Sequence, residues 1–141
     1  MNWLIALTLV VSVHDGDTVK LDDGRTIRLA GIDAPEISQP YGVQSRDQLK
    51  KLVRKDVTVI EKEKDRYGRT VAEIYRGKRS VNREMVNRGA AWWFRKYAPD
   101  DDCLRSLEAS ARKHKRGLWR SPTVVAPWDW RKEQREQTTT R

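Results

Sequence analysis

Residues 8–31 read TLVVSVHDGDTVKLDDGRTIRLAG, and this stretch decides the class of fold. Apolar and β-branched residues recur in three short runs, over 8–13, 17–21 and 25–31, which is typical of strands with one buried face. The Asp-Asp-Gly sequence at 22–24 is a strong hairpin signal between the last two runs. The stretch therefore predicts three consecutive strands.

Beyond residue 31 the pattern changes to a mixture of helices and strands. Pro35 and Pro40 bracket a loop that cannot continue the sheet. Two more strands are predicted at 57–62 and 69–75. Apolar residues at helical spacing predict three helices, over 42–55, over 81–87 and from a cap at Asp100 to a stop at Gly117.

Five short strands with a helix inserted after the third predict an α+β fold, a five-stranded OB-type Greek-key β-barrel with about three flanking helices. We expect this domain to occupy residues 8–120. Residues 1–7 would be an N-terminal extension or the remnant of a targeting segment, although the chain has no clear signal peptide. Residues 121–141 would form an extended tail that packs back onto the domain through Trp128 and Trp130.

The composition is that of a globular protein with a basic surface. The chain has 141 residues, 38% of them hydrophobic and 35% charged, and a formal net charge of +9. Such a charge favours polyanionic partners, and no basic amphipathic helix with a broad apolar face points to a membrane. The single cysteine, Cys103, excludes an intramolecular disulfide and a cysteine-rich zinc site, and we expect it to be a small packed residue.

Four acidic residues gather around the first strands: Asp15, Asp17, Asp33 and Glu36. Carboxylates held together repel one another unless a cation neutralises them. Oxygen ligands without histidine or thiolate favour Ca²⁺ or Mg²⁺ over zinc. Each acid taken singly is better explained as turn chemistry, because Asp-Gly and Asp-x-Pro are common in loops. As a set, interleaved with an arginine, they indicate a cation site.

Two arginines stand at unusual places for a strand. Arg28 interrupts a strand pattern, and Arg69 begins one directly after Tyr67-Gly68. A guanidinium group binds phosphate through parallel hydrogen bonds and stabilises the charge that grows on it. A lone strand arginine is better explained by a cross-strand salt bridge. Beside a cation and a carboxylate base, two arginines supply what water needs to attack a phosphodiester.

Five runs of sequence follow one another in a fixed order between residues 8 and 119. They are Asp15-Gly16-Asp17-Thr18-Val19, Arg28-Leu29-Ala30-Gly31-Ile32-Asp33-Ala34-Pro35-Glu36, Asp65-Arg66-Tyr67-Gly68-Arg69, Val81-Asn82-x-x-Met85-Val86-x-x-Gly89-Ala90-Ala91 and Gly117-Leu118-Trp119. Together they resemble the staphylococcal (micrococcal) nuclease, or thermonuclease, family. The tail sequence Pro127-Trp128-Asp129-Trp130-Arg131 is similar to the ending of some bacterial relatives.

The resemblance implies a Ca²⁺-dependent endonuclease of DNA or RNA, with Mg²⁺ as the alternative cation. The high positive charge and the absence of a base-reading motif predict little sequence specificity, and we expect a monomer. The resemblance further implies cleavage of the 5′ P–O bond, which leaves a 3′-phosphate, and favours a secreted or periplasmic location. By the same resemblance, the ion would be held by Asp17, Asp33 and the backbone carbonyl of Ala34. Glu36 would be the general base or orient the attacking water, and Arg28 and Arg69 would grip the scissile phosphate.

The resemblance also implies substrate contacts by Arg66, Tyr67 and Tyr97. The chain departs from the family pattern at two places. Ala34 stands where the best-known member has Thr, which matters little for a ligand that acts through its main chain. Arg95 stands where the family can have an aromatic residue, and an arginine there could stack on a base or bind phosphate. Trp92 and Trp93 are expected in the core.

The competing hypothesis is a non-catalytic module that binds nucleic acid on the same barrel, since fold alone does not decide function. The acids discriminate between the two. A binding module has no use for carboxylates that repel phosphate. The presence of these carboxylates together with Arg28 and Arg69 favours the enzyme.

Overall fold

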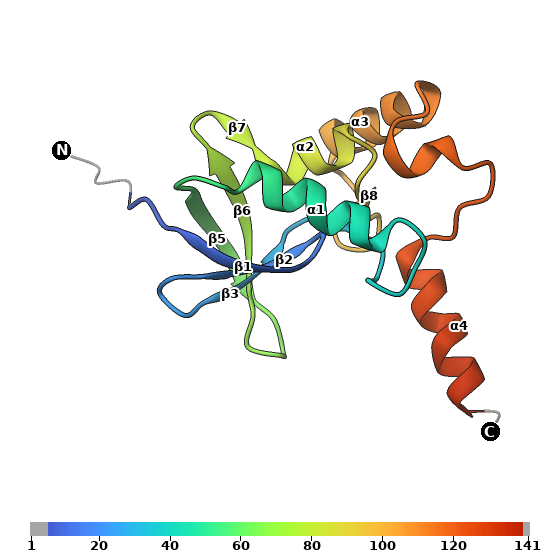
Figure 1. The fold of residues 1–141 in the computed structure, drawn as a ribbon, viewed down its shortest axis with the longest axis horizontal. Coiled ribbons are helices and arrows are strands. Elements are labelled where there is room, and N and C mark those ends of the chain that lie inside the picture. Colours follow the sequence, from blue (N-terminus) through green and yellow to red (C-terminus); the bar gives the residue numbers. More distant parts are fainter. Residues whose placement is uncertain (1–5, 140–141) are drawn as a thin grey trace.

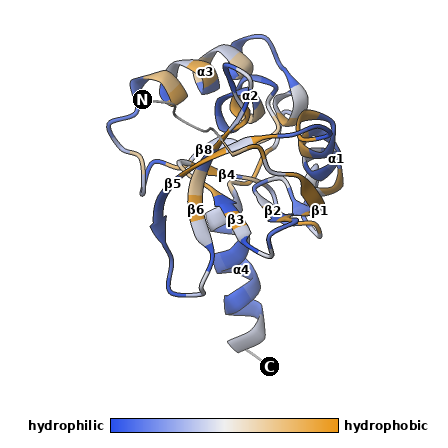
Figure 2. Cartoon of the chain, turned by 90° about the vertical axis from the view of Figure 1, so that its left-hand side faces the viewer, coloured by the Kyte–Doolittle hydropathy of each residue, from blue (hydrophilic) through white to orange (hydrophobic). Residues whose placement is uncertain are grey.

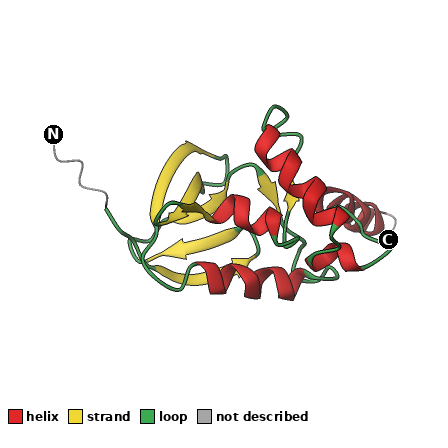
Figure 3. Ribbon diagram, turned by 90° about the horizontal axis from the view of Figure 1, so that it is seen from above, coloured by secondary structure: helices red, strands yellow, loops and turns green. Residues whose placement is uncertain are grey.

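In a computed structural model the chain folds as a mixed α+β protein in which helices pack on a twisted sheet (Figure 1). The structure is described for residues 6–139. Figure 3 shows the same arrangement from above. In chain order the elements are β1 (Val10–Asp15), β2 (Thr18–Leu21), β3 (Thr26–Leu29), β4 (Ile32–Asp33), α1 (Gly42–Leu52), β5 (Thr58–Lys64), β6 (Thr70–Arg76), β7 (Arg79–Ser80), α2 (Val81–Asn87), β8 (Trp92–Trp93), α3 (Asp102–Lys113), the 3₁₀ turn η1 (Gly117–Arg120) and α4 (Pro127–Thr139).

The main sheet contains all five predicted strands, with bounds that differ by one or two residues. Its order is β1-β2-β3-β6-β5, and the short β7 pairs with β6. The β3–β6 pair is parallel, whereas the other pairs are antiparallel. Within residues 6–139, the two ends of this path meet at one isolated bridge, between Thr8 and Val57. The sheet is therefore not closed by a full strand pair, and the closed barrel stays a prediction.

The core lies between the sheet and the helices, as the alternation in the sequence predicts. Val19 and Leu21 of β2 and Ile27 and Leu29 of β3 are each at most 1% exposed. They pack in one cluster with apolar residues of β6, α1 and α2. Apolar colouring follows this interior in Figure 2. Burial of this apolar surface is the main stabilising contribution to the fold.

Buried Asn82 joins α2 to the two parallel strands. Its amide nitrogen donates to the carbonyl oxygens of Ala30, at 3.0 Å, and Ala72, at 3.1 Å. Its side-chain oxygen accepts from the backbone N–H of Ile74 at 3.1 Å. One side chain thus satisfies backbone groups at the edge of β3 and within β6. The asparagine of the Val81-Asn82 run is structural.

Two local expectations were wrong, and one strand pair was not predicted. Asp101, and not Asp100, caps α3, because its side chain accepts from the backbone N–H of Leu104. Cys103 is exposed, since it lies on the outer face of α3. The pair of β4 with β8, which joins Asp33 to Trp92 in register, was not predicted because each strand has only two residues. Of the predicted 1–7 extension, residues 1–5 lie outside the described part of the chain.

The tail was predicted to be extended, but residues 127–139 form helix α4. Pro127 is its first residue, where a missing N–H costs nothing and the fixed φ suits a helix. Trp128 does pack back onto the domain, stacked on Phe94 at 5.5 Å between ring centroids. Trp130 is half-buried. From residue 132 onward the helix is exposed and extends away from the body (Figures 1 and 2).

We expect Asn82→Ala to lower the free energy of unfolding by about 2 kcal/mol or more, because it leaves the N–H of Ile74 buried without a partner. Urea denaturation measures this change. Arg83→Ala, at the next and exposed position of α2, is the control and should change stability by no more than about 0.5 kcal/mol. Equal stability of the Asn82→Ala protein and its parent would contradict the structural role.

Candidate active site

One open cleft collects the predicted site residues. It has a volume of about 1370 Å³ and lies among the sheet, the β5–β6 hairpin, the loop after β8 and helix α4. Of the predicted set, only Ala34 is absent from its lining, and Ala34 was expected to act through its backbone. The predicted residues that line the cleft are Asp17, Arg28, Asp33, Glu36, Arg66, Tyr67, Arg69 and Tyr97.

Asp17 is held rigidly in the turn between β1 and β2. One carboxylate oxygen accepts from the hydroxyl of Thr18 at 2.9 Å, and the other from the backbone N–H of Ala34 at 2.8 Å. Gly16 allows this approach, because a Cβ there would lie 2.7 Å from that of Ala34 and 2.8 Å from that of Ser45. The first hairpin and the Asp33-Ala34 segment are therefore locked together at the carboxylates.

Arg28 also connects the turn that carries Asp17 with the segment that carries Asp33. Its Nη1 donates to the backbone carbonyls of Leu29, at 2.8 Å, and Ile32, at 2.9 Å. Its Nη2 lies 3.3 Å from Asp33 and 3.5 Å from Asp17. Nη1 therefore hydrogen-bonds only to backbone carbonyls of the turn after β3. Only Nη2 faces the carboxylates.

Asp33 and Glu36 share a partner that the sequence did not assign to the site, Arg131 of α4. Nη2 of Arg131 lies 2.6 Å from Oδ2 of Asp33, and Nη1 lies 3.1 Å from Oδ1. The same Nη1 donates to Oε1 of Glu36 at 3.0 Å. The Asp33 side chain is 1% exposed, whereas that of Glu36 is 36% exposed. Asp33 is thus the buried member of the pair, and Glu36 is the one that solvent reaches.

The loop that carries Glu36 is fixed from its own backbone. Gln39 donates its N–H to the Glu36 carbonyl at 2.9 Å, and its side chain accepts from the Glu36 N–H at 3.2 Å. Gly42, the first residue of α1, lies directly against this carbonyl, where a Cβ would come within 1.9 Å of the oxygen. The half-exposed carboxylate therefore stands on a rigid support.

The carboxyl groups of the cleft titrate unequally. Burial, and then the charge of Asp17, raise the pKa of Asp15 to about 8. Burial also raises the pKa of Asp33, to about 6, although hydrogen bonds from Arg131 oppose the rise. For Asp17, burial is outweighed by the charge of Arg28 and the N–H of Ala34, so that its pKa is lowered. The two neighbouring acids therefore differ in the direction of their pKa shifts, with that of Asp15 raised and that of Asp17 lowered.

Arg69 stands on the opposite wall, at the end of the β5–β6 hairpin. Its Nε lies 2.7 Å from Oδ2 of Asp65, whose other oxygen accepts from the Arg69 and Tyr67 backbone N–H groups. The pairing of Arg28 with Val71 in the parallel strands places Arg69, two residues earlier, on the same face as Arg28. Arg66 donates to the hydroxyl of Tyr67, whose side chain is exposed.

The loop after β8 supplies the third wall. Tyr97 is 68% exposed and packs edge-on against Phe94 at 4.9 Å between ring centroids. Arg95 is not directed wholly to the cleft, since its Nη2 lies 2.8 Å from the buried carboxylate of Glu108 and its guanidinium lies over Trp93. Trp92 and Trp93 are buried, as expected.

A divalent cation fits the chemistry of this donor set. Four carboxyl groups, those of Asp15, Asp17, Asp33 and Glu36, face the two guanidinium groups of Arg28 and Arg131. Burial raises the pKa of Asp15 and of Asp33, and the charge of Asp17 adds to both rises, so a bound cation would favour the ionised form of these acids. However, among residues 6–139 no three acidic, histidine or cysteine side chains already converge on one point. Side-chain oxygens would have to be joined by backbone carbonyls and water.

Arg131 could have been found from the sequence by reading the tail as a helix. With Pro127 as a first residue, Trp128, Arg131 and Arg135 follow at spacings of three and four, which places them on one helical face. All three line the cleft. The proline was read instead as part of an extended segment.

Comparison with known proteins agrees with this architecture. The model of the family described as "Staphylococcal nuclease homologue" matches residues 26–121. An uncharacterized endonuclease of Escherichia coli is 46% identical over 127 residues, which cover 86% of this chain and 82% of the relative. A micrococcal nuclease of Shigella flexneri is 38% identical over 143 residues, 92% of this chain and 82% of the relative. A probable staphylococcal-like nuclease of Oryza sativa subsp. japonica is 42% identical over 110 residues, 77% of this chain and 30% of the relative.

Fold and cleft define a class of small α+β proteins whose carboxylates and arginines meet at one end of the sheet. The family match and the relatives make the assignment specific. The chain belongs to the staphylococcal nuclease family. In the part of the chain from residue 6 to 139, no helix is both long and apolar enough to cross a membrane.

The raised pKa of Asp15 predicts a change of stability with pH. Because the pKa in the folded protein, about 8, lies above the ordinary value of 3.8, the folded state binds this proton more tightly than the unfolded one. The stability contributed is present in full below pH 4 and is lost as the pH rises through 8. In chelator, Asp15→Asn should therefore remove part of the fall in the free energy of unfolding between about pH 4 and pH 8.

Urea denaturation at several pH values measures this difference. The matched control is Asp22→Asn, which removes an exposed acid from the neighbouring turn and should keep the pH dependence of the parent. Identical pH dependence in the parent and the Asp15→Asn protein would show that Asp15 ionises freely.

Proposed function

We propose that this chain is a metal-dependent nuclease that hydrolyses phosphodiester bonds in DNA or RNA. One observation carries the proposal. A single cleft gathers carboxylates and arginines from segments as far apart as residues 17 and 131. Membership of a nuclease family and relatives named endonuclease and micrococcal nuclease support it.

The cation would be held by Asp17, Asp33 and the backbone carbonyl of Ala34, with Ca²⁺ preferred and Mg²⁺ as the alternative. An all-oxygen set of this kind suits a hard cation. When bound, the ion would neutralise charge on the attacked phosphate. The rigid hydrogen bonds of Asp17 to Thr18 and Ala34 leave lone pairs on both of its oxygens, because each oxygen can accept more than one contact.

Glu36 is the group best suited to take the proton from the attacking water. Its side chain is 36% exposed, whereas Asp17 and Asp33 are buried, and its loop is fixed through Gln39 and Gly42. A base that must meet water beside a charged site needs both exposure and fixed position. On the family pattern, this attack breaks the 5′ P–O bond and leaves a 3′-phosphate.

The arginines divide the work on the phosphate. Nε of Arg69 donates to Asp65. The two Nη groups of Arg69 would therefore donate to phosphate oxygens. Arg28 has given Nη1 to backbone carbonyls and acts through Nη2. We infer that Arg69 is the main contact to the growing charge. Arg28 also holds the site together, so its substitution would confuse a rate effect with a folding effect.

Substrate recognition would depend on phosphates and not on base sequence. The cleft is lined by basic side chains from three walls, and Arg66, Tyr67 and Tyr97 project from exposed positions beside it. Guanidinium groups and exposed aromatic rings bind any strand, because every nucleotide offers a phosphate and a ring face. Cleavage would accordingly show little sequence specificity.

We expect Glu36→Gln to lower the turnover of single-stranded DNA by at least about a hundredfold, because general-base catalysis typically contributes two to four orders of magnitude. Folding and DNA binding should persist, since the amide oxygen can still accept from Arg131. Cleavage of a labelled oligonucleotide measures the rate. Glu63→Gln, which replaces an exposed carboxylate elsewhere in the same cleft, is the control and should cleave at the parental rate.

A Glu36→Gln rate within a few-fold of the parent would remove Glu36 from the mechanism. If the parent itself binds DNA and RNA but cleaves neither with any cation, the chain is a non-catalytic binding module instead.

Removal of divalent cations should abolish cleavage, because oxygen donors alone suit Ca²⁺ or Mg²⁺. Added Ca²⁺ should restore it better than Mg²⁺, because Ca²⁺ accepts irregular coordination by protein oxygens whereas Mg²⁺ demands near-ideal octahedral geometry. Cleavage assays in chelator, followed by titration of each cation, provide the measurement. Full activity in excess chelator, or restoration by Zn²⁺ alone, would contradict the proposed ligand set.

A further inference from the structure

We propose that Arg131 occupies the cation site when the ion is absent and that helix α4 acts as a latch over it. The cation and Arg131 then compete for the carboxylates of Asp33 and Glu36. The inference rests on the proposed function, because it concerns the same site.

The contacts of Arg131 carry the inference. Both of its Nη groups lie on Asp33, at 2.6 and 3.1 Å, and one also lies 3.0 Å from Glu36. An arginine in this fork arrangement matches a carboxylate as well as any side chain can. Oδ1 of Asp33 already has Nη2 of Arg28 at 3.3 Å. A divalent ion that approached these oxygens would meet two guanidinium charges within a few ångströms.

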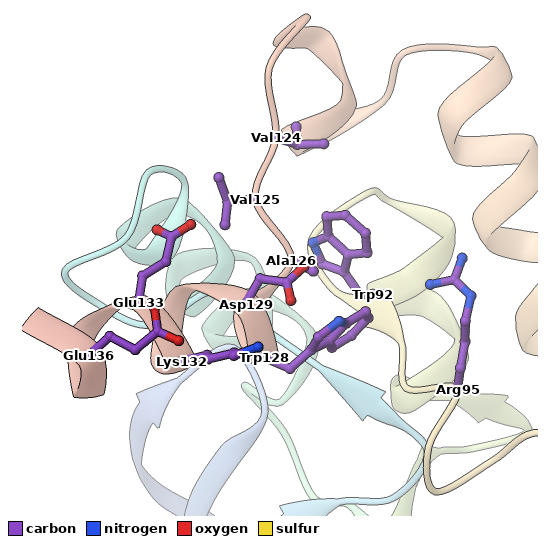
Figure 4. A pocket seen from close by; sticks show the side chains of 10 residues that line it. All are labelled: Trp92, Arg95, Val124, Val125, Ala126, Trp128, Asp129, Lys132, Glu133 and Glu136. Carbon is purple, nitrogen blue, oxygen red and sulfur yellow. The ribbon is translucent and has the colours of Figure 1, made fainter.

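Helix α4 is attached to the domain by a few apolar and aromatic residues at its start. Ala126, just before the helix, is buried among Trp92, Leu118 and Trp119. Trp128 lies edge-on against Trp92 at 5.4 Å between ring centroids. Both indoles line a second cavity of about 650 Å³, and Figure 4 shows them among its lining side chains. Trp128 also lines the cleft of the candidate active site.

The rest of α4 buries little surface. All described residues from 132 to 139 are exposed, and the helix extends outward beyond Arg131 (Figure 1). Segments with few buried contacts open locally at small free-energy cost. Arg131 lies where the anchored first turn meets this exposed part. Local opening from residue 131 onward therefore releases its guanidinium group while Trp128 and the core stay in place.

A latch of this kind lowers the apparent affinity for the ion. When only a fraction of the molecules has the binding-competent arrangement, the apparent dissociation constant is the intrinsic one divided by that fraction. The ion in turn shifts α4 toward the released position, because it binds that arrangement better. Ion binding and loosening of α4 are thus one coupled event.

Calorimetric titration of Ca²⁺ into the full chain tests the competition. Arg131→Gln should bind Ca²⁺ at least about tenfold more tightly than the parent, since a charge-assisted contact no longer has to be broken. The matched control is Lys132→Gln, which removes the same charge from the next position of the helix, on the side of the other cavity. It should bind Ca²⁺ within about twofold of the parent.

Hydrogen exchange in residues 127–139 provides a readout that is independent of activity. In the parent, exchange in α4 should increase when Ca²⁺ is added. In Arg131→Gln it should be fast with and without the ion.

The outcomes distinguish failure of the latch from failure of the proposed metal-dependent function. Equal or weaker Ca²⁺ binding by Arg131→Gln would overturn the latch and leave the proposed nuclease standing, and so would unchanged exchange in parental α4 on addition of Ca²⁺. Absence of binding by the parent and by every variant, to Ca²⁺ and to Mg²⁺, would contradict the metal-dependent function, and the latch with it.

Discussion

The structure depends on one electrostatic constraint, the burial of Asp17 and Asp33 at the end of the sheet. A carboxylate removed from water needs hydrogen bonds or cations around it, or it stays protonated. Here the N–H of Ala34 and the guanidinium groups of Arg28 and Arg131 surround the pair. The fold brings four separate segments together to provide hydrogen bonds and ion pairs for these two carboxylates. The same assembly forms a cleft lined by carboxylate and guanidinium groups.

Several features that look unrelated serve this constraint. Gly16 and Gly42 lack side chains where backbone and neighbouring atoms approach too closely for a Cβ. Asn82 connects α2 to β3 and β6, whose parallel pairing places Arg28 and Arg69 on one face. Replacing a buried acid with an apolar residue would remove the need for its partners. Retention of a costly buried charge is consistent with a site that uses it.

The sequence predicted those parts of the fold that depend on local pattern. The alternation of apolar residues in β2 and β3 and their helical spacing in α2 predict the type of each element and the face that it buries. The structure confirms both. The β4–β8 pair was missed because two-residue strands carry no period. Helix α4 was missed because its second half is polar all round, so no apolar stripe marks it. Arg131 was missed with it, since its importance depends on a contact across 98 positions of sequence.

The most direct test of the account is to let the protein cleave a single-stranded oligonucleotide in ¹⁸O-labelled water with Ca²⁺ and to weigh the products. Hydrolysis in this cleft predicts internal cuts that leave a 3′-phosphate carrying one ¹⁸O atom and a 5′-hydroxyl on the other fragment. Strands that are bound but remain intact, products without ¹⁸O, or a phosphate on the 5′ side would contradict it.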